Sequence, residues 1–269
     1  MSNLRILYVA SEILPFLQTS EVASFVRKLP QAMQERGMEI RILVPRFGII
    51  NERKNRLHEV VRLSGINIAV GDEEKPLVIK VASIPNAKLQ VYFIDNEDYF
   101  QRKSVFHDKE KKFYDDNDER AIFFCKGVLE TVKKLGWAPD IIHCNDWITS
   151  LIPLYVKTTY KNDPIFQTAK TVFTVYDTHF PHKFQSEGLI EKAKMIDIED
   201  QMLSNLQSAD YEGFVKMGVE YADAVIKAED ESSEGLDGLL NGMEKKVDTI
   251  EKDDNFLDSY YNLYNELAG

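Results

Sequence analysis

Polar side chains that could hold a small ligand follow two short apolar runs of the sequence. Asp146 comes directly after one run, and Tyr176, Asp177 and His179 end or follow another. If both runs are parallel strands of one sheet, their carboxyl ends lie at the same edge, where folds of this kind bind ligands. These four residues would then line a crevice. An aspartate at a strand end can also do no more than bond to the backbone, so the pattern leaves both roles open for Asp146.

A second polar group, Gln18, Thr19, Ser20 and Glu21, stands directly before the first predicted helix. The free N–H groups and the dipole at a helix start attract anions such as phosphate. Ser20 is predicted to cap this helix, and Glu21 places its own carboxylate in the first turn. The sequence therefore favours a helix start that is neutralised by its own residues.

The segments that position these residues alternate between strand and helix. Short apolar runs rich in β-branched residues are typical of buried parallel strands, and apolar residues at helical spacing mark the helices between them. This alternation predicts the α/β class, with a single Rossmann-like, doubly wound parallel sheet. The predicted strands are residues 4–10, 39–45, 77–84, 89–94, 141–144, 170–176 and 223–226, and the predicted helices are residues 20–36, 118–135 and 148–157.

The predicted organisation is one domain with a short C-terminal extension. Residues 1–228 form the domain, and residues 229–255, rich in Glu, Asp, Ser and Gly near their start, are predicted to be an acidic linker. Residues 256–269 are predicted to form a helix that packs back on the domain. Its apolar face is expected to contain Phe256, Tyr260, Leu263, Tyr264 and Leu267.

Composition limits the partners and the compartment. The net charge of −11 is wrong for a nucleic-acid binder, which needs a basic stripe, and for binding to anionic membranes. The two cysteines are too few for a disulfide framework. The N-terminus, Met1 and Ser2 included, lacks a leader pattern, and no uncharged run reaches membrane-spanning length. We therefore expect a cytoplasmic protein with no nucleic-acid or membrane partner.

Five ordered segments resemble the N-terminal half of bacterial glycogen synthases and plant starch synthases. The resemblance covers roughly residues 4–228 and implies the N-terminal Rossmann-like domain of a GT-B glycosyltransferase. Members of that family transfer glucose from ADP-glucose to the end of an α-1,4-glucan and need no metal, so the resemblance implies neither a metal nor a cofactor. The segments are residues 8–16 (Tyr-Val-Ala-Ser-Glu, then Pro-Phe), 29–48, 116–120 (Asp-Asn-x-x-Arg), 139–147 (the Asp-Trp motif) and 216–223.

The loop before the first helix departs from the family pattern. The family reads Lys-Thr-Gly-Gly-Leu there, and its lysine and glycines contact the sugar nucleotide. Here Gln18 replaces the lysine, Thr19 is kept, and Ser20 and Glu21 replace the glycines. The resemblance thus implies a degenerate donor loop. The alternative is a rearranged loop that still binds a sugar nucleotide.

The crevice departs from the family as well. The family's histidine that contacts the transferred glucose is Tyr176 here, followed by Asp177, whereas Asp146 matches the motif aspartate near the glucose hydroxyls. His179 or His182 would have to substitute for that histidine. The resemblance therefore implies that the catalytic candidates, Asp146, Tyr176 and Asp177, form a degenerate crevice.

Family members also carry a second Rossmann domain, which supplies an essential arginine, lysine and glutamate. After residue 228 this sequence contains only the predicted linker and helix. Tyr260, Leu263 and Tyr264 resemble the family's last helix, which crosses back to the N-terminal domain. Our hypothesis is that the second domain was deleted and the crossing helix kept.

Three functions remain open. The first is a non-catalytic glycogen-synthase-like protein that binds an α-glucan or a sugar nucleotide, or regulates a partner protein of glycogen metabolism. The second is an active glucosyltransferase, alone or with a partner chain. The third is a Rossmann-type domain for another small ligand. For the first function, a sugar-stacking or docking patch could be formed by aromatic side chains, although the sequence favours core packing for most of them: Tyr99, Phe100, Phe106, Phe113 and Tyr114.

Overall fold

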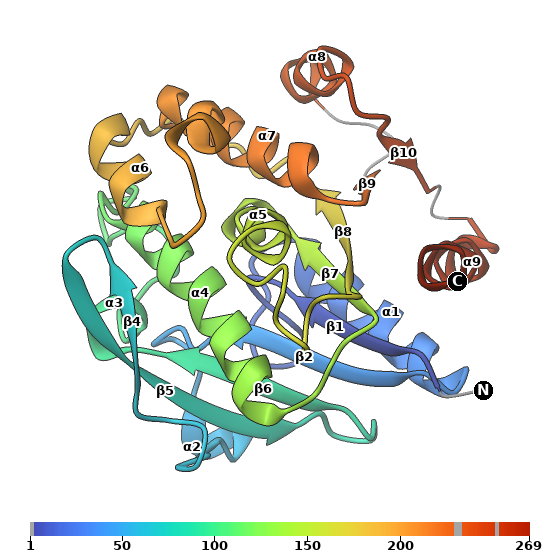
Figure 1. The fold of residues 1–269 in the computed structure, drawn as a ribbon. Coiled ribbons are helices and arrows are strands. Elements are labelled where there is room, and N and C mark those ends of the chain that lie inside the picture. The colour runs from blue at the N-terminus through green and yellow to red at the C-terminus, as the bar shows by residue number, and fades with distance from the viewer. Residues whose placement is uncertain (1–2, 229–232, 251–252) are drawn as a thin grey trace.

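The structure is a mixed α/β fold around a mostly parallel central sheet (Figure 1). The computed structural model describes residues 3–228, 233–250 and 253–269. Its strands are β1 (Arg5–Val9), β2 (Glu39–Pro45), β3 (His58–Glu59), β4 (Ile66–Val70), β5 (Glu73–Ser83), β6 (Gln90–Asp95), β7 (Ile141–Asn145), β8 (Lys170–Val175), β9 (Ala224–Lys227) and β10 (Asp248–Thr249).

The strand order confirms the doubly wound sheet predicted from the sequence. The order is β10-β9-β8-β7-β1-β2-β6-β5-β3, and β4 pairs with β5 outside this path. From β1 the parallel sheet grows through β2 to β6 on one side and through β7 to β9 on the other. The chain therefore reverses its direction of growth between β1 and β7. In sheets of this kind, that switch point opens a crevice at the carboxyl ends of the strands.

Helices cover both faces of the sheet. In Figure 1, α4, α5 and α7 lie in front of the sheet and α1 lies behind it. The long helix α4 ends as predicted at Gly136, which takes the left-handed conformation with φ 61° that favours glycine. The helices are α1 (Val22–Glu35), α2 (Glu52–Asn55), α3 (Glu97–Phe100), α4 (Asn117–Leu135), α5 (Ile152–Lys157), α6 (Ser186–Ala193), α7 (Tyr211–Tyr221), α8 (Glu234–Asn241) and α9 (Phe256–Ala268), with 3₁₀ helices η1 (Trp147–Thr149) and η2 (Asp200–Ser208).

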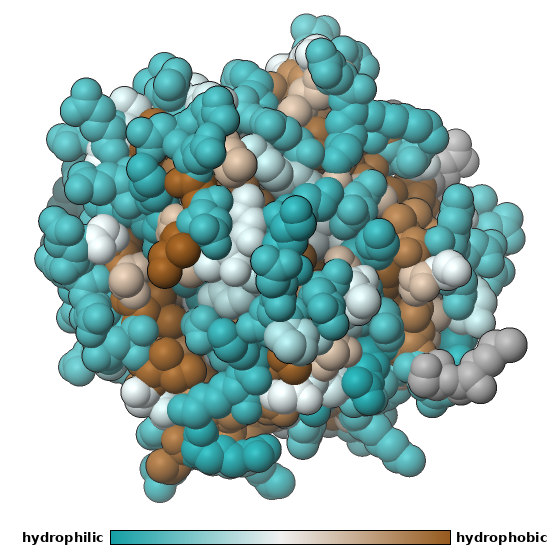
Figure 2. All heavy atoms as spheres, in the orientation of Figure 1, coloured by the Kyte–Doolittle hydropathy of each residue, from teal (hydrophilic) through white to brown (hydrophobic). Residues whose placement is uncertain are grey.

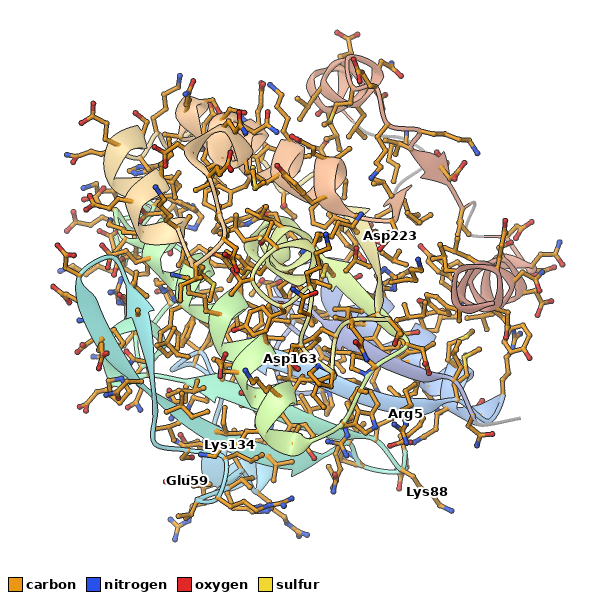
Figure 3. The ribbon with its side chains drawn as sticks, viewed as in Figure 1. Arg5, Glu59, Lys88, Lys134, Asp163 and Asp223 are labelled. Carbon is orange, nitrogen blue, oxygen red and sulfur yellow. The ribbon has the colours of Figure 1, made fainter. Side chains whose placement is uncertain are left out.

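Two aspartates of the motifs hold strand starts, at the end of the sheet away from the crevice. Asp140 accepts a hydrogen bond of 2.8 Å from the backbone N–H of Arg5 at the start of β1. Asp223 accepts one of 2.7 Å from the N–H of Thr171 in β8 and pairs with Lys157 at 3.2 Å. Figure 3 shows Arg5 and Asp223 well apart, beside different strands. These two positions fix the register of the strands and do not belong to a ligand site.

The structure corrects the prediction of a linker over residues 229–255. Residues 229–232 and 251–252 lie outside the described part of the chain. Between them, α8 forms where the acidic and small residues predicted no element, and β10 pairs with β9. Ser233 caps α8 by accepting a hydrogen bond of 3.3 Å from the N–H of Leu236, and Leu236 and Leu240 are buried one turn apart. One capping serine and two leucines at helical spacing outweigh the polar composition.

The C-terminal helix α9 packs against α1 and β7. Phe256, Tyr260 and Tyr264 are buried at intervals of four residues, so their rings form one stripe along the helix. Leu263 and Leu267, predicted on the same face, are only half-buried at its margin. Arg36 at the end of α1 holds the outer side of α9 by pairing with Asp258 at 2.6 Å.

The outer surface is mainly polar. Figure 2 shows one face covered largely by hydrophilic side chains, with apolar ones in separate small areas. Among the described residues, no helix is long and apolar enough to cross a membrane.

Candidate functional site

The switch point places two carboxylates at the carboxyl ends of neighbouring strands. Glu12 follows β1 and Asp146 follows β7, and these strands pair in parallel along Ile6–Val9 and Ile141–Cys144. Both side chains are buried, with exposed fractions of 2% for Glu12 and 4% for Asp146. The candidate site is therefore built around two acids that lie below the surface.

Glu12 binds the loop that precedes α1. Its carboxylate accepts hydrogen bonds from the backbone N–H groups of Thr19 (2.5 Å) and Ser20 (2.7 Å), and from the hydroxyls of the same residues (2.9 Å and 2.5 Å). Four donors to one buried carboxylate make a strong, charge-assisted contact. In the sequence, Glu12 stands out only as part of a motif. An acidic residue three positions after the end of a buried strand was the signal that could have identified it.

The predicted capping role of Ser20 is wrong. Helix α1 begins at Val22, Glu21 holds the N-cap position, and no side chain makes the standard capping bond there. The Ser20 hydroxyl accepts instead from the N–H of Val22 at 3.2 Å, while it donates to Glu12. Ser20 thus connects the helix start to the buried carboxylate of Glu12. Because its hydroxyl donates to Glu12, Ser20 does not form the local cap expected from the sequence.

A hollow of about 640 Å³ opens over this loop. We call it the loop hollow. It contains all four predicted loop residues and the exposed side of the first turns of α1, and the start of α9 closes one side. Among the described residues that line it, the only basic one is Lys28 and the only acidic one is Glu21. The lining residues are Gln18, Thr19, Ser20, Glu21, Ser24, Phe25, Lys28 and Phe256.

Asp146 lies beneath the surface and does not line the loop hollow. Its carboxylate accepts a hydrogen bond of 2.8 Å from the N–H of Trp147 and another from the hydroxyl of Thr178. Burial raises the pKa of Asp146 to about 7, the two hydrogen bonds oppose the rise, and the charge of Glu12 adds to it. Its backbone has φ 71° and ψ 164°, a region that non-glycine residues rarely occupy. This conformation and the raised pKa are both common at functional sites.

The other predicted crevice residues have separate partners. Tyr176 is buried, and its hydroxyl donates to the Asn145 side chain at 3.2 Å. Asp177 accepts a hydrogen bond of 2.8 Å from the N–H of Ser233 before α8. The ring of His179 is exposed and packs edge-on against Tyr211, with centroids 5.4 Å apart. A common crevice of these residues with Asp146 stays a prediction.

Most of the aromatic side chains considered for a docking patch lie in the core, the role that the sequence favoured. Tyr99, Phe100 and Phe113 are buried. The ring of Phe113 stacks on Phe180 with centroids 4.5 Å apart, and Phe106 packs on Trp147. These rings support the segment that holds Trp147 and do not form a sugar platform.

The structure adds a residue that the sequence analysis did not single out, His143 in β7. Nδ1 of its imidazole lies 2.7 Å from the hydroxyl of Tyr264 in α9, and Nε2 lies 2.6 Å from the hydroxyl of Thr174 in β8. The hydroxyl of Tyr8 donates to that of Tyr264 at 3.1 Å. Burial lowers the pKa of His143 to about 3, so the imidazole is neutral at ordinary pH. We call Tyr8, Tyr264, His143 and Thr174 the buried polar chain.

No cluster of three or more metal-ligating side chains occurs within residues 3–228, 233–250 and 253–269.

Comparison with known proteins shows the family to which the chain is similar. A sequence profile described as "Starch synthase catalytic domain" matches residues 5–241. The glycogen synthase of Chlorobium luteolum is 37% identical over 267 residues, covering 92% of this chain and 53% of the relative. That of Chlorobaculum parvum is 36% identical and covers 91% and 54%. The chain thus spans about half the length of the curated relatives it matches.

A solved structure agrees at the level of the fold. The catalytic domain of starch synthase IV from Arabidopsis thaliana, bound to ADP and acarbose, matches with a TM-score of 0.72. The match covers 92% of this chain and 51% of that chain, at 19% identity. This likeness supports the GT-B type of fold and does not identify the residues that bind a ligand.

Proposed function

This chain belongs to the family of starch synthase catalytic domains, and we propose that it works in α-glucan metabolism as a glucan-binding protein that transfers no glucose by itself. Its relatives are named glycogen synthases. In this proposal the chain binds a glucan but does not transfer glucose, because the side chains of the loop differ from those of the family while the fold is the same.

The observation that carries the proposal is the contact between Glu12 and the loop. The N–H groups of Thr19 and Ser20 already donate to a buried carboxylate. A phosphate at this loop would compete with Glu12 for those donors, and it would meet a further carboxylate at Glu21. Gln18 stands where a cation would be needed to offset this repulsion.

The loop hollow is better suited to an uncharged sugar than to a nucleotide. Phe25 and Phe256 contribute aromatic rings, while the hydroxyls of Thr19 and Ser24 and the amide of Gln18 can donate and accept hydrogen bonds. A mainly apolar wall with a few polar groups is the usual lining of a small-molecule site. A malto-oligosaccharide presents matching apolar faces and hydroxyls.

The test separates binding from transfer. The full chain is incubated with glycogen and either ADP-glucose or UDP-glucose, and maltoheptaose binding is measured by calorimetry. We expect maltoheptaose to bind and neither donor to be consumed. Glucose transfer by the purified chain would overturn the non-catalytic part of the proposal, and absence of maltoheptaose binding would overturn the glucan-binding part.

A loop variant sharpens this test. The triple variant Q18K/S20G/E21G restores the family's cation and glycines, and we expect it to bind ADP-glucose at least about tenfold more tightly than the wild type. The control Gln31→Lys adds one positive charge on α1 outside the loop hollow, of the two by which the triple variant raises the net charge, and should leave ADP-glucose binding unchanged. Equal binding by the triple variant and the wild type would show that the loop residues do not exclude the nucleotide.

A second candidate function follows from Asp146. An acid with a pKa of about 7 at the switch point is suited to proton exchange. This favours an active transferase in which a partner protein of glycogen metabolism supplies the nucleotide-binding half. Transfer that appears only after a cell extract is added, and that is lost with Asp146→Asn, would support this candidate over the first.

A further inference from the structure

Helix α9 forms one wall of the loop hollow, although it lies more than 200 residues from the loop in the sequence. Its first residue, Phe256, lines the hollow together with residues 18–28. The ring of Phe25 lies 6.0 Å from that of Phe256 and 5.5 Å from that of Tyr260. The ammonium of Lys28 lies 5.1 Å above the Phe256 ring. Without α9, the hollow would lose one of its two aromatic rings and the support of the other.

The attachment of α9 is narrow. Of its 13 residues, only Phe256, Tyr260 and Tyr264 are buried. An isolated helix of this length is marginal in water, so α9 stays helical mainly because this stripe is docked. Undocking therefore also melts the helix, and the exchange of its backbone amides reports its docking directly.

The deep end of the stripe is held by the buried polar chain. Since Tyr8 donates to Tyr264, the Tyr264 hydroxyl is left to donate to Nδ1 of His143. Nε2 then carries the imidazole proton and donates to Thr174. All four side chains are fully buried. This directed set of hydrogen bonds requires a neutral His143. A proton on Nδ1 would occupy the lone pair with which Nδ1 accepts the hydrogen bond from the Tyr264 hydroxyl.

Within the residues that the structure describes, no opposite charge packs against the His143 ring to balance such a proton. The groups packed around its ring are Tyr8 from β1, Phe25 from α1, Thr174 from β8, and Tyr260 and Tyr264 from α9. Burial is the cause of its depressed pKa. Protonation therefore favours the undocked helix, in which water can reach the imidazole.

We propose that α9 is a releasable wall of the loop hollow, latched by the buried polar chain, so that binding of a malto-oligosaccharide and docking of α9 stabilise each other. The inference rests on the proposed function for its ligand, and it adds the regulation of that site. A ligand that touches Phe256 binds the docked form more tightly, and by linkage it must protect α9.

The experiment measures amide hydrogen exchange in α9 for the full chain, with and without saturating maltoheptaose. We expect the ligand to slow exchange in α9. Tyr264→Phe keeps the ring and removes the hydroxyl, so the Tyr8 hydroxyl and Nδ1 of His143 lose this partner, and exchange in α9 should speed up by about ten- to a hundredfold. Tyr261→Phe is the matched control, because that half-buried ring lies against Arg36 and does not belong to the buried polar chain. This variant should change the exchange of α9 little. Maltoheptaose should bind Tyr264→Phe more weakly than Tyr261→Phe.

Acidification gives an independent readout that does not use the ligand. After correction for intrinsic exchange rates, a change from pH 7.5 to 5.5 should speed exchange in α9 about tenfold in the wild type. The factor is about tenfold because pH 5.5 lies about one unit below the ordinary imidazole pKa. The same change should have little effect in His143→Gln. Equal acceleration in both proteins would contradict the proposal that the buried polar chain holds α9 in its docked position.

The outcomes separate this inference from the proposed function. If maltoheptaose binds the wild type and Tyr264→Phe equally and leaves α9 exchange unchanged, the releasable wall is wrong while glucan binding stands. If maltoheptaose binds neither protein, the proposed function is wrong and the coupling is wrong with it. Weaker binding by Tyr264→Phe together with protection of α9 in the wild type supports both.

Discussion

Replacing His143 with glutamine should change how stability depends on pH. Folding takes the imidazole from a pKa of about 6.5 to about 3, so the unfolded chain binds an extra proton at mildly acid pH. A depressed folded pKa means that stability present above pH 6.5 is lost as the pH falls. The linkage relation gives a loss of about 2 kcal/mol by pH 5 and about 3 kcal/mol by pH 4. His143→Gln removes this titration and keeps a donor and an acceptor in place.

The wild-type curve alone would hide this effect. Asp146 has the opposite sign, because its folded pKa of about 7 lies above the ordinary value. Its contribution to stability is fully present below the ordinary pKa and is lost as the pH rises through 7. When the pH falls from 8 to 5, Asp146 adds about 2 to 3 kcal/mol to the free energy of unfolding. This gain nearly cancels the loss from His143.

The assay is therefore a difference measurement. Urea unfolding of the wild type and of His143→Gln at pH 8, 6.5 and 5 gives the free-energy difference between the two proteins, from which the carboxylates cancel. We expect the advantage of the wild type to shrink by about 2 kcal/mol from pH 8 to pH 5. His58→Gln, at an exposed position in β3, serves as the control, and its difference should stay within about 0.5 kcal/mol. A pH-independent difference for His143→Gln would refute the neutral buried imidazole.

Three further changes test other parts of the structure. Glu12→Gln should lower the free energy of unfolding by about 1.5 to 3 kcal/mol in urea titrations, because charge-assisted bonds to the loop are lost; an unchanged midpoint would contradict that contact. Asp146→Asn should gain stability over the wild type by about 2 to 3 kcal/mol on going from pH 5 to pH 8, since only the wild type must ionise a buried acid; parallel curves would argue against the raised pKa. Gly218→Ala should cost about 1 to 3 kcal/mol in thermal melts, because the added Cβ would lie 2.4 Å from the Phe173 ring, whereas Gly188→Ala meets open space and should be neutral or stabilising.

The parallel sheet could be predicted because each central strand is short, apolar and buried on both faces. The predicted range 39–45 is β2 as observed, and residues 141–144 fall one residue short of β7. Among the elements that escaped prediction, β4 and α8 did so for different reasons. In β4, the apolar residue Ala69 is exposed, so the residue types alternate only over residues 66–68, too short a pattern to separate from a loop. In α8, the acidic composition masked two buried leucines.

The orientations of the candidate site residues could not be predicted from the sequence. In the structure the four loop residues line one hollow, and Asp146 lies at the switch point. The inward turn of Tyr176 could not be read from the sequence, because it depends on a partner, Asn145, that is 31 residues away. The role of His143 was hidden for the same reason, since its two contacts come from different elements.

Residues at one end of the sheet stabilise the fold, and residues at the opposite end form the candidate site. Asp140 and Asp223 bond to backbone at strand starts, so replacing either would unpair N–H groups that the sheet needs. Gln18 and Glu21 lie on an exposed loop at the opposite end, where a change of side chain disturbs no strand. Substitutions at that loop can therefore remove a phosphate site at little cost in stability. Glu12 is the exception, because its carboxylate lies in the core and holds the loop whatever ligand the loop binds. A chain with this arrangement can keep its family's fold and a sugar-sized hollow after the nucleotide site has gone, which is the combination that the binding and transfer assays separate.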